Sequence, residues 1–175
     1  MDMMKKLFAL LLAAMLLVSC SACAETVRLS EDSEVFDITL EIPDGAVFLP
    51  FVTNGISMAH VQQEGMAHVF ISVAFSELYE GNLADVEESE REALIAAQTK
   101  DFGDMTVLPG VTPEGNMYVE FRANSGTDLG MVWTLYQGYF IQLTLYYENG
   151  QPLTDADRDF MMELLYGMHF VPAEN

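Results

Sequence analysis

Residues 129–147 read LGMVWTLYQGYFIQLTLYY, the longest stretch of the chain with a composition typical of β-strands. Valine, isoleucine, threonine and aromatic residues dominate it, and these side chains suit a pleated, buried surface. Gly138 divides the stretch into two apolar halves of similar length. We therefore predict two antiparallel strands joined by a tight turn at Gly138, and we place this hairpin in the middle of a sheet.

The turn of this hairpin decides which side chains share a face of the sheet. We predict a bulged three-residue loop that ends at Gly138, with Leu135 opposite Tyr139. In the same register Trp133 lies opposite Ile141. One face is then wholly apolar and consists of Met131, Trp133, Leu135, Ile141, Leu143 and Leu145. A two-residue loop would shift the register by one residue and mix the two faces, which the burial pattern disfavours.

The opposite face of this hairpin mixes aromatic rings with hydrogen-bonding groups, and it is the candidate binding face. A neighbouring strand near residues 117–121 adds polar and charged side chains to it. Tyrosines supply contact area, and Arg122 supplies a fork of donors for an anion or a carboxylate. The predicted binding residues are Tyr118, Glu120, Arg122, Tyr136, Phe140 and Tyr146. The alternative is that one of the protein's own helices covers this face.

Alternation of apolar and polar residues predicts further strands around the hairpin. These strands span residues 36–42, 46–52, 56–61, 67–75, 105–108 and 117–121. A helix is predicted over residues 83–99 with Asn82 as its N-cap, and a second helix begins after Thr154. Asp157 stands in the position of a capping acid, and one apolar stripe follows it, made of Phe160, Met161, Leu164, Leu165 and Met168.

This order of elements predicts a single α+β domain over residues 35–171. Its centre is an antiparallel sheet of about six to seven strands, and its helices pack on the faces of that sheet. We therefore expect an α/β/α sandwich.

Residues 1–24 have the pattern of an export signal. Lys5 and Lys6 precede an apolar run, Leu7–Val18, which is shorter than the roughly 20 residues that a membrane span needs. Leu17-Val18-Ser19-Cys20 then resembles the lipobox of bacterial lipoproteins, in which the cysteine is acylated. We therefore expect an exported protein that Cys20 anchors to the cell membrane. The alternative is cleavage after Ala24, which would release a secreted protein.

Both cysteines of the chain, Cys20 and Cys23, lie in this leader. The predicted domain therefore has no disulfide and no reactive thiol, and packing must stabilise it. Residues 25–34 are rich in acidic and polar side chains, and we predict an acidic tether there between the anchor and the domain.

The chain is strongly acidic: 7 Lys and Arg residues stand against 27 Asp and Glu residues, a formal net charge of −20. A field of this sign repels nucleic-acid phosphates and anionic lipid headgroups. We therefore expect no nucleic-acid binding and no membrane contact except through the lipid anchor. The expected partner of the monomer is a protein or a small neutral or cationic ligand. The simpler alternative is that the acidic surface only maintains solubility.

Motifs typical of active sites are missing from the sequence. It contains no G-x-S-x-G, no glycine-rich phosphate loop after a strand and no H-E-x-x-H. With a two- or four-residue loop, the hairpin at 56–75 places His60 and His68 on opposite faces, where they cannot share a metal ion. His169 follows the last helix and is interpreted as a surface residue. We therefore predict no catalytic residue, no metal and no cofactor, and we do not expect an enzyme.

Two segments resemble a known family. The first strand ends in Ile38-Thr39-Leu40-Glu41-Ile42-Pro43-Asp44-Gly45, and the closing helix runs from Leu153-Thr154-Asp155 to Met168-His169-Phe170. With the mid-chain helix and the strand-rich second half, they resemble the PsbP-like superfamily, which includes DcrB-type bacterial lipoproteins. The resemblance covers Val35–Phe170 and implies a role in binding or assembly.

We therefore expect a lipid-anchored, non-catalytic binding module at the cell envelope. The alternatives are a secreted structural subunit and a hydrolase, but a hydrolase would need a clustered nucleophile and base that the sequence does not show.

Overall fold

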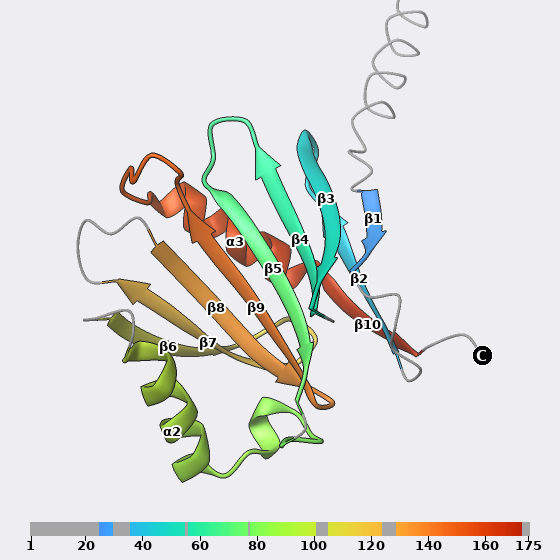
Figure 1. The fold of residues 1–175 in the computed structure, drawn as a ribbon, viewed down its shortest axis with the longest axis vertical. Coiled ribbons are helices and arrows are strands. Elements are labelled where there is room, and N and C mark those ends of the chain that lie inside the picture. The colour runs from blue at the N-terminus through green and yellow to red at the C-terminus, as the bar shows by residue number, and fades with distance from the viewer. Residues whose placement is uncertain are drawn as a thin grey trace, which may run out of the picture.

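The computed structural model describes residues 25–29, 36–54, 56–76, 78–100, 105–123 and 129–172. The predicted signal peptide and Cys20 lie outside the described residues, as does the tether over residues 30–34. Within the described residues the chain forms two antiparallel sheets, two α-helices and one short 3₁₀ helix (Figure 1).

The larger sheet has seven strands in the order β3-β4-β5-β9-β8-β7-β6. Its strands are β3 (Ala46–Thr53), β4 (Ile56–Gln63), β5 (His68–Phe75), β6 (Met105–Val111), β7 (Met117–Ala123), β8 (Leu129–Tyr136) and β9 (Tyr139–Tyr146). All neighbouring pairs are antiparallel, and β9 occupies the middle of the sheet between β5 and β8. The predicted central position of the hairpin is therefore confirmed.

The smaller sheet joins the two ends of the domain. It has the order β1-β2-β10 and consists of β1 (Glu25–Arg28), β2 (Phe36–Ile42) and β10 (Met168–Pro172). Residues 25–28, expected in a tether, instead pair with β2, and Leu29 after them is buried. The folded domain therefore begins about ten residues earlier than predicted, and β10 is a strand that the sequence pattern did not indicate.

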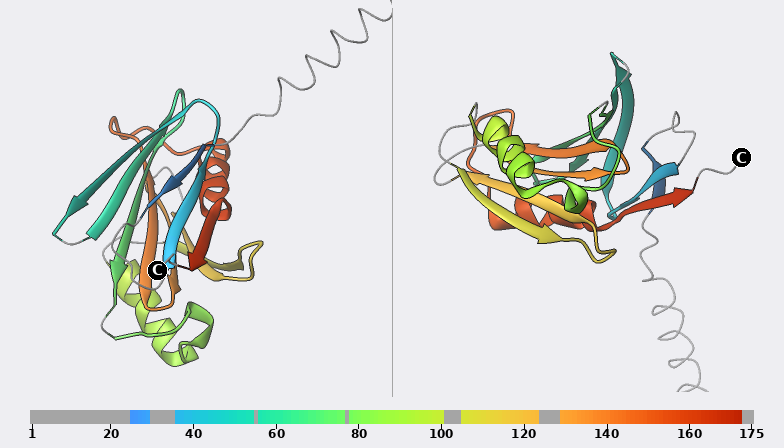
Figure 2. Two further views of the ribbon diagram at one scale, coloured as in Figure 1. Left: turned by 90° about the vertical axis from the view of Figure 1, so that its right-hand side faces the viewer. Right: turned by 90° about the horizontal axis from the view of Figure 1, so that it is seen from below.

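Helix α3 (Asp155–Tyr166) covers one side of the seven-stranded sheet, called the α3 side below (Figure 2). Its N-terminus is capped by Thr154 as predicted. The side chains of its apolar stripe are buried and form the main core with inward residues of β2, β5 and β9. These side chains are Phe160, Met161, Met162, Leu164 and Leu165.

A 3₁₀ helix, η1 (Leu83–Asp85), and helix α2 (Glu88–Thr99) cover part of the opposite side, called the open side. The predicted single helix over residues 83–99 is wrong, because Val86 has extended backbone angles and separates η1 from α2. Asn82 caps η1 rather than an α-helix. The predicted arrangement, an antiparallel sheet with helices on its faces, is confirmed.

Candidate binding face

The β8–β9 hairpin has a two-residue turn, so the predicted register is wrong by one residue. Tyr136 pairs with Tyr139, and Leu135 pairs with Phe140. The turn residues Gln137 and Gly138 have positive φ angles of 46° and 84°, which is the backbone of a type I′ turn.

Contacts with a distant loop hold this turn. The backbone N–H of Gly138 donates to the carbonyl oxygen of Gly81 at 3.0 Å, and its own carbonyl oxygen accepts from Ser76 at 2.7 Å. The N–H of Gln137 donates to the side-chain oxygen of Asn82 at 3.1 Å. These tertiary contacts favour the two-residue turn, and the hairpin sequence alone does not show them.

The corrected register divides the six predicted binding residues between the two sides of the sheet. Four of them lie on the α3 side, namely Tyr118, Glu120, Arg122 and Tyr136. Phe140 and Tyr146 lie on the open side, where Phe140 packs with Trp133 and Tyr146 with Phe70. The predicted common face is therefore wrong.

The two tyrosines on the α3 side help to hold the last elements of the chain against the sheet. The Tyr118 ring is buried, and its hydroxyl lies 3.1 Å from that of Tyr166 in α3. Burial and this hydrogen bond raise the pKa of Tyr118 to about 12. Tyr136 stacks on Phe170 of β10, with ring centroids 3.7 Å apart. The protein's own elements therefore cover these two tyrosines, as the alternative to a binding face predicted.

Glu120 is the only charged side chain besides Asp157 that is buried among the described residues. Arg158 of α3 donates to both of its carboxylate oxygens, with Nη2 2.8 Å from Oε2 and Nε 2.5 Å from Oε1. Arg122 donates to Oε1 at 3.1 Å but is about half exposed. Burial by itself raises the pKa of Glu120, but the arginine contacts outweigh it and lower the pKa. The carboxylate is therefore ionised at neutral pH.

A cavity of about 160 Å³ lies beside this ion-pair cluster. The guanidinium groups of Arg122 and Arg158 line it together with apolar side chains such as Leu145, Leu153 and Met161. Glu120 and Asp155 also line the cavity and balance the two positive charges. The cavity therefore offers no net charge to an anion, which weakens the predicted role of Arg122 in binding one.

The open side of the sheet is covered over only one half. There η1, α2 and strands β6–β9 enclose a second core, made of Leu83, Val86, Val119, Phe121, Met131, Trp133 and Leu135. Helix α2 has no buried residue and contributes only the partly buried Leu94 and Ile95. The other half, over β3, β4, β5 and the end of β9, carries five partly exposed rings that we call the aromatic patch. The aromatic patch consists of Phe51, His60, His68, Phe70 and Tyr146.

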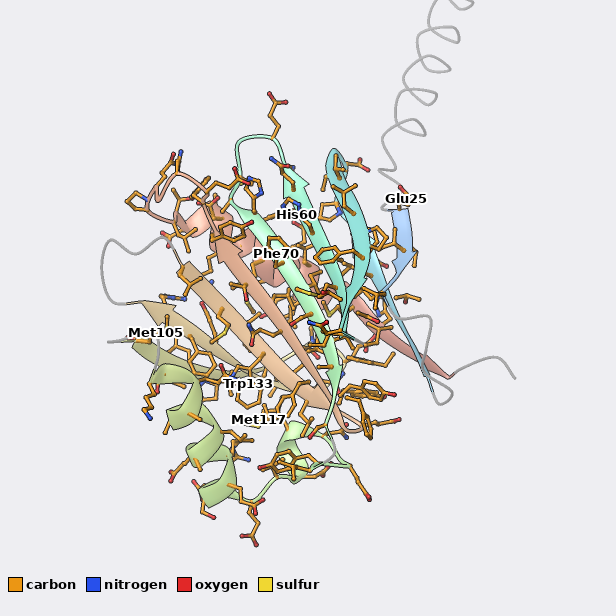
Figure 3. All side chains as sticks on the ribbon, in the orientation of Figure 1. Glu25, His60, Phe70, Met105, Met117 and Trp133 are labelled. Atoms are coloured by element: carbon orange, nitrogen blue, oxygen red, sulfur yellow. The ribbon has the colours of Figure 1, made fainter. Side chains whose placement is uncertain are left out.

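The rings of the aromatic patch are in mutual contact. Phe70 lies at the centre, beside His60 (Figure 3). Its ring centroid is 4.9 Å from that of His60 and 5.5 Å from that of Tyr146. Phe51, which is 40% exposed, meets Phe70 edge to face at 6.2 Å. Four strands thus contribute to one continuous aromatic surface.

His60 and His68 lie on the same face, so the predicted opposite placement is wrong. The register pairs His60 with Phe70 and Val61 with Val69, which leaves seven residues, 62–68, between these last partners. The predicted two- or four-residue loops require an even number there. In the observed register Nε2 of His60 lies 2.8 Å from Nδ1 of His68.

The aromatic patch continues onto the edge strand β3. Val47 and Leu49, which share a face of β3 with Phe51, are 56% and 54% exposed. Leu49 pairs with His60, so this apolar edge adjoins the aromatic patch. Of the six predicted binding residues, only Tyr146 belongs to the aromatic patch. The signal that was available is the alternation of His68 and Phe70 with buried valine and isoleucine along one strand.

His169 lies in β10 and contacts two carboxylates. Its Nδ1 lies 2.5 Å from Glu114 of the β6–β7 turn, and its Nε2 lies 3.4 Å from Glu41 of β2. The hydrogen bond to Glu114 is the main cause that raises the pKa of His169. His169 therefore links three elements rather than standing free on the surface, as the sequence had suggested.

Within the described residues, no helix is long and apolar enough to cross a membrane. No group of three or more His, Cys, Asp or Glu side chains in the same residues is arranged to hold a metal ion.

Comparison with known proteins gives structural similarity without a sequence match. No protein-family model and no curated protein sequence matches the chain. Among solved structures, the chain is similar to the solution structure of cyanobacterial PsbP (CyanoP) from Synechocystis sp. PCC 6803, with 13% identity and a TM-score of 0.49. The match covers 86% of this chain and 95% of that chain. At these values, the similarity concerns the general arrangement of strands and helices.

Proposed function

We propose that this protein is an exported, lipid-anchored binding module of the cell envelope that holds a protein partner on the aromatic patch. One observation carries the proposal: Phe51, His60, His68, Phe70 and Tyr146 form a contiguous, partly exposed aromatic surface on the open side of the sheet. The leader in the sequence, with Lys5, Lys6 and the segment ending at Cys20, supports export and anchoring.

Aromatic side chains are the residues best suited to such a surface. They bring a large contact area with few rotatable bonds, and they are enriched among the residues that contribute most to binding energy. The exposed apolar edge formed by Val47 and Leu49 extends this area. A contiguous apolar surface with polar surroundings is typical of a site for another protein.

Charge narrows the class of partner. The net charge of −20 disfavours an acidic partner and favours a neutral or basic one through long-range attraction. At the patch itself, His60 and His68 contact one another, and Gln62 lies 3.4 Å from His68. These contacts bring together no nucleophile and base, so we propose binding rather than catalysis.

A photo-crosslinking experiment in intact cells tests this proposal. Benzoylphenylalanine is placed at Phe51 in one variant and at Tyr166 in another, because these two rings are 40% and 39% exposed but lie on opposite sides of the sheet. We expect a defined crosslinked product from position 51 and none from position 166. Adding Phe70→Ala and Tyr146→Ala to the position-51 variant should remove that product while circular dichroism shows a folded protein.

Products of equal yield from both positions would contradict the proposal, as would a product at position 51 that survives the loss of both rings. No product from position 51 in cells that contain the anchored protein would also overturn it.

A further inference from the structure

We propose that His60 and His68 form a two-histidine site for a divalent transition-metal ion of the zinc class. The two side chains project from neighbouring strands to the same side of the sheet, and Nε2 of His60 lies 2.8 Å from Nδ1 of His68. This site requires no protein partner, so it stands or fails independently of the function proposed above.

The spacing of the two nitrogens is close to what one metal ion needs. Zinc binds imidazole nitrogens at about 2.0–2.1 Å, and tetrahedral angles then place two such nitrogens about 3.3 Å apart. The observed separation of 2.8 Å must therefore open by about half an ångström, which small rotations of both side chains supply. Both rings are only partly buried, so the gap between them is accessible from solvent.

The free nitrogen of each ring is available for an outer hydrogen bond. In the metal-bound form each ring carries its proton on the outer nitrogen, Nδ1 of His60 and Nε2 of His68.

An outer partner for one ring is already in place. The amide of Gln62 lies 3.4 Å from Nε2 of His68, and turning this amide presents its oxygen to the N–H there. Such an outer hydrogen bond is the usual way in which proteins orient a metal-binding histidine. Glu148 is near enough for its negative charge to raise the pKa of His60, and the same charge attracts a cation.

The two imidazoles are expected to leave the remaining coordination positions to water. A site of this kind binds an exchangeable ion rather than a permanent structural metal. Imidazole ligands select zinc, copper and nickel over calcium and magnesium, which prefer oxygen.

Isothermal titration with zinc chloride at pH 7.5 tests the site, with the full chain carrying Cys20→Ser and Cys23→Ser because these two thiols would bind zinc themselves. We expect one equivalent of zinc to bind, and we expect His60→Ala and His68→Ala each to weaken binding at least tenfold. His169→Ala is the matched control, because the third histidine of the chain is bound to Glu114 and Glu41 instead. Magnesium chloride should give no binding to any variant.

NMR of the imidazole nitrogens supplies a second measurement on the unmodified chain. Zinc should shift Nε2 of His60 and Nδ1 of His68 and leave both nitrogens of His169 unchanged. At pH 5.5 zinc binding should weaken at least tenfold, because binding then displaces protons from the ligands. The site is disproved if zinc at 1 mM produces no shift at these two nitrogens, or if both alanine variants, shown to be folded by circular dichroism, bind zinc as the native chain does.

Discussion

At the scale of single residues, Glu120 shows how a tertiary contact changes the meaning of a charge. In the sequence it stands two positions from Arg122, a spacing typical of a weak surface ion pair. In the structure Glu120 is 4% exposed and is bound chiefly by Arg158. Arg158 lies in line with Met161, Met162 and Leu165 on α3, so a basic residue within an apolar stripe was the available signal.

We predict that Arg158→Met destabilises the domain by about 2–4 kcal/mol, because it leaves Glu120 buried with only the half-exposed Arg122 as a partner. Urea denaturation at pH 7 measures the change in the free energy of unfolding. Combining Arg158→Met with Glu120→Met should recover much of the loss, because the uncompensated buried charge is then gone.

Arg122→Met is the matched control, with an expected loss below about 1 kcal/mol. If Arg122→Met destabilised the domain more than Arg158→Met, the assignment of Arg158 as the main partner would be wrong.

At the scale of elements, the start of α3 is fixed to the sheet by one carboxylate. Asp157 is fully buried and accepts four hydrogen bonds: its Oδ2 binds the N–H and hydroxyl of Thr154, and its Oδ1 binds the N–H of Ala67 and the hydroxyl of Tyr147. The sequence predicted the capping role. The contacts to Ala67 and Tyr147 attach the same carboxylate to the β4–β5 turn and to the end of β9.

Asp157→Asn is predicted to reduce the free energy of unfolding by about 2–3 kcal/mol at pH 7, because an amide nitrogen then faces donors that the carboxylate had accepted from. Asp155→Asn is the matched control in the same helical turn. Asp155 is exposed, and its loss should cost only about 0.3–1 kcal/mol through the helix dipole. Equal losses in the two variants would show that the buried contacts add nothing to the cap.

The effect of Asp157→Asn on the free energy of unfolding should depend on pH. Burial alone would raise the pKa of Asp157, but the hydrogen bonds from Thr154, Ala67 and Tyr147 lower it below the ordinary value of 3.8. A lowered pKa in the folded state stabilises the fold above the unfolded pKa, and this contribution disappears as the pH falls through the folded pKa. The stability difference between the native chain and Asp157→Asn should therefore shrink below about pH 4.

At the scale of the whole molecule, strand β1 bears on how the domain meets the membrane. Because β1 begins at Glu25, an acylated Cys20 would be followed by only residues 21–24 before the folded domain. Four extended residues span at most about 14 Å. The proposed anchor would therefore hold the domain close to the lipid surface.

We predict that Cys20→Ala abolishes incorporation of a labelled fatty acid and moves the protein from the membrane fraction to the soluble fraction of cells. Cys23→Ala is the matched control, and it should retain both the label and the membrane location. A native protein whose intact mass shows an unmodified N-terminus at Glu25 would contradict the anchor and favour the secreted alternative.

The sequence by itself determined the kinds of elements and several of their boundaries, because that information is local. Alternating side chains define the strands, and Thr154 with Asp157 defines the start of α3. Contacts between distant segments decided which side chains meet. Ser76, Gly81 and Asn82 hold the two-residue turn at Gln137 and Gly138. This turn sent Tyr136 and Tyr146 to opposite sides of the sheet.

In the β4–β5 hairpin, too, the length of the turn decided which side chains share a face. An odd number of residues between the paired Val61 and Val69 brought His60 and His68 together, although the predicted registers separated them. Because side chains alternate along a strand, an error of one residue in a turn exchanges the two faces. For this reason the tertiary structure, and not the sequence, decided where the aromatic patch lies.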